Sequence, residues 1–190
     1  MTRVILGIAG ASGAALALDC ARALRRAGAE VDLVMSPTSE RTLTEEVGTG
    51  AMAALTGTAT RTWAVTDMGA AISSGSHPVA GMIVAPCSMR SLAAIAHGLD
   101  DNLIIRAAGV QLKERRPLVL LAREAPLTLA HLRNMTAVTE MGAVVLPPVP
   151  AFYLRPKTVD EITAQIAARA VDLLRLGPPQ ARAWAPEERE

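Results

Sequence analysis

The fold is decided by residues 3–35, which read RVILGIAGASGAALALDCARALRRAGAEVDLVM. Residues 3–10 and 30–36 are short apolar segments with β-branched side chains, and each ends at small or polar residues, as buried strands do. Between them, from Ala14, apolar side chains recur at helical spacing, and Gly28 follows as a cap. The stretch therefore predicts a strand, a helix and a second strand.

The same alternation continues to residue 177. Further strands are predicted at residues 81–88, 117–124 and 143–152, and helices at 37–45, 88–98, 101–114, 126–142 and 158–177. Residues 48–76 are rich in Gly, Thr, Ala and Ser, and predict only short mixed elements and loop. Apolar strands that are each followed by a helix are typical of a parallel sheet covered on both faces. We therefore predict a single doubly wound α/β domain over residues 1–177 and a flexible tail at residues 178–190.

Two helix ends carry recognisable signals. In the helix at 126–142, Pro126 stands early and Gly142 lies just past the end. Thr158 and Glu161 have the spacing of a capping box at the start of the last helix.

The composition excludes several classes of protein. The chain is 51% hydrophobic but only 2% aromatic, which does not suit a protein that binds bases by stacking. A formal net charge of +1 gives no broad surface for nucleic acid, and the high apolar content excludes intrinsic disorder. The composition therefore predicts a compact domain with an aliphatic core.

Cysteine usage and hydropathy indicate a cytoplasmic protein. Cys20 and Cys87 are far apart and form no C-x-x-C pair, so we expect two buried thiols rather than a disulfide or a zinc site. The first apolar segment is short and interrupted by glycine, which indicates a strand rather than a signal peptide. Apolar segments are too short to span a membrane.

In doubly wound sheets, ligands bind beyond the carboxyl ends of the strands. The residues that follow the predicted strands are Gly10–Gly13, Ser36–Ser39, Pro86–Ser91, Arg123–Pro126 and Pro150–Tyr153. Three of these segments place small or hydroxyl residues at a helix start, where free N–H groups and the helix dipole favour an anion. The alternative is that each Ser or Thr only caps its own helix.

Arg123 and Glu124 stand out among the charged residues between Arg106 and Glu124. An apolar strand delivers this pair to the predicted site edge, where charges are costly unless they are paired or functional. The arginine could bind a phosphate, and the carboxylate could transfer a proton to or from it. Arg115 and Arg116 are better explained as exposed cations at a helix C-terminus.

Other common sites are disfavoured by spacing. Gly7, Gly10 and Gly13 are spaced G-x-x-G-x-x-G, which is neither the dinucleotide fingerprint nor the P-loop. The three histidines are scattered without metal-ligand spacing, and no serine lies in a G-x-S-x-G elbow. We therefore expect no metal site and no hydrolase.

Four stretches carry a resemblance to a known family. These are GIAGASGA near the start, SSGSHPVAGMIVAPCSMRSLAAIAHG, DNLIIRAAGVQLKERRPLVLLAREAPLTLAHLRNM and GAVVLPPVPAFYLRP. They resemble the UbiX-type flavin prenyltransferases, which belong to a flavodoxin-like, Rossmann-like flavoprotein family that also contains cysteine decarboxylases. The resemblance covers residues 3–176 and is densest in the second half of the chain.

The resemblance implies a metal-independent transfer of a dimethylallyl group from dimethylallyl phosphate to N5 and C6 of reduced FMN. The prenylated FMN then serves a separate UbiD-type decarboxylase, in ubiquinone biosynthesis among other uses. Members of the family usually assemble as dodecamers with sites at subunit interfaces.

The resemblance also implies which residues form the site. The flavin-binding residues would be Gly10, Ala11, Ser12, Ser36, Ser88, Met89, Arg90, Ser91 and Arg123. The pocket for the prenyl donor would contain Tyr153, Arg169, Lys113, Arg106, Glu124 and Glu46. Some of these would reach the pocket from a neighbouring subunit.

The expected roles follow from the chemistry of a phosphate leaving group. Lys113, Arg169 and Tyr153 could neutralise its charge through hydrogen bonds. Glu124 is the candidate general acid and base, and Ser12 could orient the proton released near N5. Both roles are hypotheses.

One segment departs from the family. Some members carry a Trp before the SSGS motif as a wall for the prenyl group, whereas this chain has VTDMGAAI, in which Met68 could fill the volume. Three other interpretations remain: an FMN-dependent cysteine decarboxylase, a flavin-binding module without catalysis, and a subunit named for phenolic decarboxylation that makes the cofactor.

Overall fold

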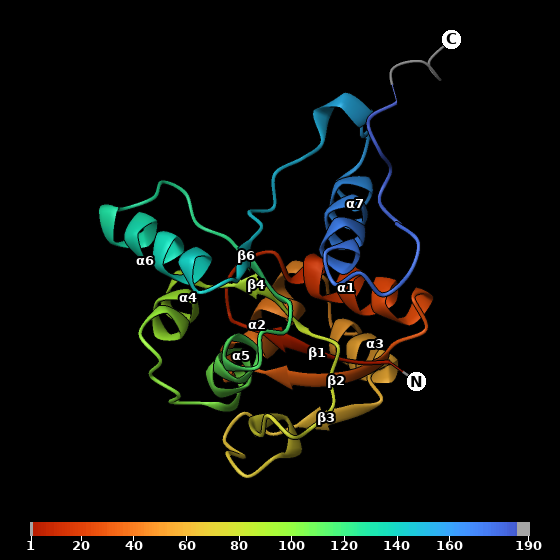
Figure 1. Ribbon diagram of the computed structural model, residues 1–190. Coiled ribbons are helices and arrows are strands. Elements are labelled where there is room, and N and C mark those ends of the chain that lie inside the picture. Colours follow the sequence, from red (N-terminus) through yellow and green to blue (C-terminus); the bar gives the residue numbers. More distant parts are fainter. Residues whose placement is uncertain (1, 186–190) are drawn as a thin grey trace.

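The computed structural model describes residues 2–185 and contains one sheet of six parallel strands, in the order β3-β2-β1-β4-β5-β6 (Figure 1). The strands are β1 Arg3–Ile8, β2 Glu30–Met35, β3 Arg61–Trp63, β4 Met82–Cys87, β5 Leu118–Ala122 and β6 Val144–Val145. The order reverses direction between β1 and β4, which confirms the predicted doubly wound α/β fold. Strand β3 was not predicted, because its three residues are polar or half-exposed and lie at the sheet edge.

Helices cover both faces of the sheet. One face carries α1 Ala14–Arg26, α2 Pro37–Glu46, α3 Ala51–Thr58 and α7 Val159–Asp172, and the other carries α4 Met89–Ala96, α5 Leu103–Lys113 and α6 Leu129–Glu140. Two short 3₁₀ helices, η1 Ala71–Ser73 and η2 Phe152–Leu154, complete the elements.

Alternating residues of each strand contribute to two separate hydrophobic cores, one on each face of the sheet. In β1, Leu6 packs with the α1 and α7 side, whereas Ile5 packs with the α5 side. Between α1 and α7 the core is built largely from small side chains, among them Ala17 and Ala170. Such residues allow helices to approach closely, which is why so few rings are needed to fill the interior.

One predicted helix start and one predicted capping box need correction. Helix α6 begins at Leu129, and Pro126 lies in the loop before it, because Thr128 and His131 form a reciprocal capping box that fixes the first turn. In α7, the Thr158 hydroxyl accepts a hydrogen bond from the Glu161 N–H, as predicted. The Glu161 carboxylate, however, accepts from the Lys157 N–H instead of completing the capping box.

Glycine ends two helices as predicted. Gly28 and Gly142 follow α1 and α6 with φ of +73° and +103°, a left-handed conformation that favours glycine.

The C-terminal segment differs from the predicted flexible tail. The backbone N–H groups of Gln180 and Ala181 donate to the Asp172 carboxylate, and Arg182 pairs with the side chain of Gln165. Residues 180–182 are therefore fixed against α7. The rest of the predicted tail, 186–190, lies outside the described residues.

Both cysteines are free and buried, as expected. Burial raises the pKa of the Cys87 thiol to about 12 and that of the Cys20 thiol further still. Both side chains are therefore protonated at neutral pH and act as core residues. None of the helices within residues 2–185 is long and apolar enough to cross a membrane.

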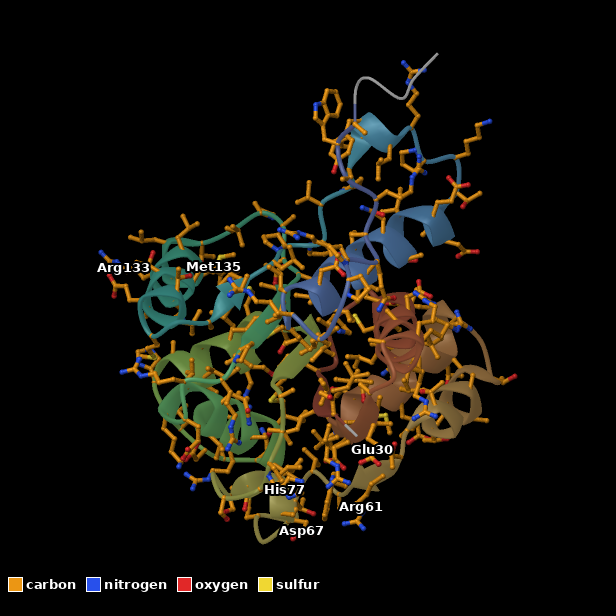
Figure 2. The ribbon with its side chains drawn as sticks, turned by 45° about the vertical axis from the view of Figure 1, so that its right-hand side comes forward. Glu30, Arg61, Asp67, His77, Arg133 and Met135 are labelled. Carbon is orange, nitrogen blue, oxygen red and sulfur yellow. The ribbon has the colours of Figure 1, made fainter. Side chains whose placement is uncertain are left out.

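Asp32 is a buried carboxylate that ties three strands to the loop before β4. Its side chain, in a residue only 2% exposed, accepts a hydrogen bond of 3.1 Å from the indole N–H of Trp63. Its second oxygen lies 3.6 Å from Arg3 Nε and 3.5 Å from His77 Nε2. Figure 2 shows His77 and Glu30 together at this end of the molecule, where Glu30 also pairs with Arg3.

We predict that Asp32→Ala lowers the free energy of unfolding by roughly 2–3 kcal/mol, because it leaves the indole N–H of Trp63 without its buried acceptor and removes a carboxylate beside Arg3. Asp67→Ala, which removes an exposed carboxylate nearby, is the matched control and should change the free energy by less than about 0.5 kcal/mol. Chemical denaturation followed by circular dichroism measures both. Equal losses in the two variants would contradict a structural role for the buried carboxylate.

Candidate functional site

The candidate site lies at the carboxyl edge of the sheet, where the strand order reverses between β1 and β4. Backbone hydrogen bonds continue past the strand ends here: Ala9 N–H donates to the Pro86 carbonyl and Arg123 N–H to the Cys87 carbonyl. On the other side of β1, the Ser36 N–H donates to the Ile8 carbonyl. The loops after β1, β2, β4 and β5 therefore lie side by side along one edge.

The loop after β1 binds an anion, and that anion is a carboxylate of the same chain. Gly13, with φ of +110°, caps α1 without a side chain, and the N–H groups of Gly13 and Ala14 both donate to Glu46 Oε2 over 2.8 Å. The sequence predicted an anion cradle at this turn, which is correct. It did not predict that Glu46, the last residue of α2, would fill it.

The charge of Glu46 is stabilised by its surroundings. Burial of the carboxylate would raise its pKa, but the hydrogen bonds from Ala14, Gly13 and the Ser12 side chain and the positive charge of Arg123 outweigh burial. The pKa of Glu46 is therefore held below its ordinary value of 4.5. Ser12, Glu46 and Arg123 thus form one interacting group at this edge.

The start of α2 presents two hydroxyl groups beside the first loop. Ser36 is the N-cap of α2 but makes no side-chain capping bond, and its hydroxyl lies 3.2 Å from the Thr38 hydroxyl. A Cβ at Gly10 would lie 1.9 Å from Thr38 Oγ1, so only glycine permits this close approach. Thr38 was missed by the sequence analysis, where it was one polar residue among several.

The segment after β4 uses its side chains mainly to build the start of α4. Ser88 Oγ accepts from the Ser91 N–H over 3.1 Å and donates to Ser91 Oγ, so here the capping alternative is correct. Met89 is almost fully buried, and the Arg90 guanidinium forms an ion pair with Asp101. Ligand contacts from this segment would therefore come chiefly from its backbone.

Arg123 and Glu124 follow β5 and are both exposed. The expected cost of burying charges at this edge therefore does not arise. The Glu124 carboxylate accepts a hydrogen bond only from the N–H of its neighbour Ala125, over 3.1 Å, among the described residues. It remains accessible for contact with a ligand.

Tyr153 and Arg169 line a separate cavity of about 440 Å³. The cavity lies between the residues that follow β6, the segment around η2, helix α7 and the C-terminal segment. Its lining residues include none of loop 10–13 or of residues 88–91. The predicted donor residues Tyr153 and Arg169 are thus brought together in a cavity of their own.

Arg106 and Lys113 do not join that cavity within one chain. Both lie on α5, where Arg106 donates to the Ser73 carbonyl over 3.1 Å and pairs with Asp100 at 2.8 Å. Lys113 pairs with Glu114 at the end of α5 that leads into the start of β5, which is the opposite edge of the sheet. Within one chain these two residues therefore lie apart from Tyr153 and Arg169, and their contribution from a neighbouring subunit stays a prediction. Met68, the expected prenyl wall, is 42% exposed.

The carboxyl edge fits a phosphorylated flavin. It offers the hydroxyls of Ser36 and Thr38, the cation of Arg123, and a cradle at Gly10 that a side chain would fill. The helix N-termini of α2 and α4 point to the same edge.

The comparisons with known proteins agree on one family. The flavoprotein family model matches residues 1–171. A flavin prenyltransferase UbiX from Thauera aromatica is 49% identical over 189 residues, which are 99% of this chain and 97% of the relative. A crystal structure of a UbiX protein in complex with FMN and dimethylallyl pyrophosphate has a TM-score of 0.93 at 43% identity, over 98% of this chain and 99% of its own.

Two further structures define the limits of the comparison. A dodecameric FMN-dependent UbiX-like decarboxylase from Escherichia coli O157:H7 has a TM-score of 0.91 at 43% identity, over 97% of this chain and 100% of its own. The cypemycin decarboxylase CypD has a TM-score of 0.67 at 17% identity, over 93% of each chain, and shares the fold alone.

We predict that Glu46 makes stability depend on pH in the acid range. Because its pKa is lowered in the folded protein, its charge stabilises the fold above about pH 4.5, and this contribution is lost as the pH falls through the lowered pKa. Glu46→Gln should therefore be less stable than wild type at pH 7, and the difference should shrink below about pH 4.5. Urea unfolding between pH 3 and 7 measures it.

Glu45→Gln, on the same helix with a largely exposed carboxylate, controls for the loss of one surface charge. A difference for Glu46→Gln that stays constant across the pH range would refute the coupling between the Glu46 charge and the start of α1.

Proposed function

Because the chain belongs to the flavoprotein family and, within it, to the UbiX flavin prenyltransferases, we propose that it transfers a dimethylallyl group from dimethylallyl phosphate to reduced FMN. The carbon–oxygen bond of the donor breaks and phosphate leaves. N5 bonds to C1 of the dimethylallyl group and releases its proton. C6 then bonds to C3 of the group, C2 of the former double bond gains a proton, and the proton on C6 is lost. The observation that carries the proposal is the group of Ser12, Glu46 and Arg123 at the sheet edge, together with a cavity lined by Tyr153 and Arg169.

The flavin would be held by loop backbone and short polar side chains. Ser36 and Thr38 offer hydroxyl groups for its phosphate, Arg123 offers a cation, and residues 88–91 offer the N-terminus of α4. When bound, reduced FMN supplies two nucleophilic atoms, N5 and C6. The Ser12 hydroxyl, hydrogen-bonded to Glu46, would orient the proton at N5.

The donor phosphate would be held in the cavity of Tyr153 and Arg169. Charge-assisted hydrogen bonds from a guanidinium and a phenol stabilise the negative charge that builds up as the carbon–oxygen bond breaks. Glu124 would protonate the departing phosphate or accept the C6 proton, since its carboxylate stays accessible at the edge.

Arg106 and Lys113 would complete the donor pocket from a neighbouring copy, as part of a dodecamer like that of the Escherichia coli O157:H7 relative. Helix α6 supports self-association, because it buries only Val138 fully and exposes Leu129 and Leu132 to solvent. Figure 2 shows this helix, with Arg133 and Met135, on the outside of the molecule. The product would serve a separate UbiD-type decarboxylase.

The cysteine decarboxylase alternative is less well supported. It calls for a catalytic histidine near the flavin. His131, however, is used in the capping box of α6, His77 lies beside Asp32 and Arg3, and His97 lies at the C-terminal end of α4, away from the edge where that helix begins. A flavin-binding module without catalysis would have no need of the second, cationic cavity.

Incubation with reduced FMN and dimethylallyl phosphate under anaerobic conditions tests the proposal. We expect mass spectrometry of the released flavin to show the mass increment of a dimethylallyl substituent. A parallel reaction with the diphosphate covers the donor bound in the structurally similar UbiX protein. Absence of the increment with both donors would overturn the proposed activity.

Glu124→Gln should slow prenylation by roughly 10²-fold or more, because the amide cannot transfer the proton. FMN binding, measured by fluorescence titration, should stay within about twofold of wild type. Glu140→Gln, at the end of α6, is the matched control and should leave both quantities unchanged. Wild-type prenylation kinetics in Glu124→Gln would remove Glu124 from the mechanism.

A further inference from the structure

The C-terminal segment, residues 178–185, is bound along one face of α7 by four hydrogen bonds. The Gln165 amide donates to the Arg182 carbonyl and accepts from the Arg182 N–H, both over 3.0 Å. The Asp172 carboxylate accepts from the N–H groups of Gln180 and Ala181 over 2.7 and 3.0 Å. Two α7 side chains, seven residues apart, therefore hold the backbone of this segment in place.

Arg169 lies on the same helix face between these two anchors. Positions 165, 169 and 172 are spaced four and three residues apart, so their side chains share one face of the helix. The C-terminal segment therefore runs over Arg169. Its residues Pro179, Ala181, Arg182 and Ala183 line the 440 Å³ cavity together with Tyr153 and Arg169.

The Tyr153 ring also contacts this segment. It meets Trp184 edge to face, with ring centroids 5.2 Å apart. Asp172 thus holds the segment at residues 180 and 181, Gln165 holds it at Arg182, and the Tyr153 ring contacts it at Trp184.

The charges around the cavity favour an anion. Arg169 and Arg182 both line it, and neither guanidinium has an ion-pair partner among residues 2–185. Among residues 2–185, Asp172 is the single carboxylate of the lining, and both its oxygens already accept backbone N–H groups. The lining of the cavity thus includes two arginines and a tyrosine, and Arg182 also borders a neighbouring cavity lined by Arg26 and Glu161.

We propose that Arg182 is a further phosphate-binding residue for the prenyl donor, and that Gln165 and Asp172 are positioning residues that hold it over the cavity. This inference rests on the proposed prenyl transfer. Arg182 differs from Tyr153 and Arg169 because it stands on the C-terminal segment, so donor binding depends on that segment remaining docked on α7. A guanidinium suits this place, since it offers several N–H donors to one phosphate.

Steady-state kinetics with dimethylallyl phosphate test the assignment. We expect Arg182→Ala to raise the KM for the donor and the inhibition constant of inorganic phosphate together, by about tenfold or more. Arg182→Lys should recover part of the loss. The affinity for FMN should stay within about twofold, because none of the flavin-side loops touches this cavity. Arg22→Ala, which removes an exposed arginine on α1, is the control.

The anchors give a second, independent measurement. Gln165→Ala combined with Asp172→Asn should raise the KM for the donor in the same way, and adding Arg182→Ala to this variant should have little further effect. Additive effects would mean that the anchors do not act through Arg182 and would overturn their positioning role.

The results separate this inference from the activity on which it rests. If wild type prenylates FMN but Arg182→Ala keeps the donor KM and the phosphate inhibition constant within twofold, Arg182 is not a phosphate ligand and the proposed function stands. If wild type does not prenylate FMN, calorimetric titration with inorganic phosphate still decides whether Arg182 binds the anion. Equal phosphate affinity in wild type and Arg182→Ala would overturn the assignment.

Discussion

The parallel direction of all six strands is the constraint on which the site depends. Because every strand ends at the same edge, the segments after β1, β2, β4 and β5 lie next to one another although they are far apart in the sequence. Backbone hydrogen bonds beyond the strand ends, such as that from Arg123 N–H to the Cys87 carbonyl, keep these segments aligned. The residues of the candidate site therefore come from several loops, which the parallel sheet brings together at one edge.

Within this edge the charges are divided between two places. The N–H groups of Gly13 and Ala14 already donate to Glu46, so these two groups hold a carboxylate and are not free to bind a phosphate. Arg169 and Arg182, by contrast, line the cavity beside α7 and form no ion pair within residues 2–185. A negatively charged group close to Ser12 suits the handling of protons, and a pair of cations suits a leaving phosphate. This division separates the acceptor side of the proposed reaction from the donor side.

Sequence periodicity predicted the fold because buried parallel strands are apolar throughout and therefore stand out from amphipathic helices. It failed for β3, where three residues at the sheet edge have little to bury. The loops of the site could be predicted from their place after the strands, but the link between Gly13 and Glu46 spans 33 residues and leaves no local signal. The docked C-terminal segment was missed for a similar reason. Its composition is that of a flexible tail, and only the side chains of α7 fix its backbone.

The alanine-rich interior couples the two halves of the site. Helix α1 begins at the loop that we propose to face the flavin, and α7 carries Arg169 and the anchors of the C-terminal segment. The two helices pack side by side, with Ala17, Ala21 and Ala170 in one core cluster (Figure 1). Small side chains bring the two backbones close and leave little free volume between them, so a shift of one helix is transmitted to the other. The distance between the acceptor and donor sides is therefore set by close helix packing, for which large aromatic side chains would be unsuitable.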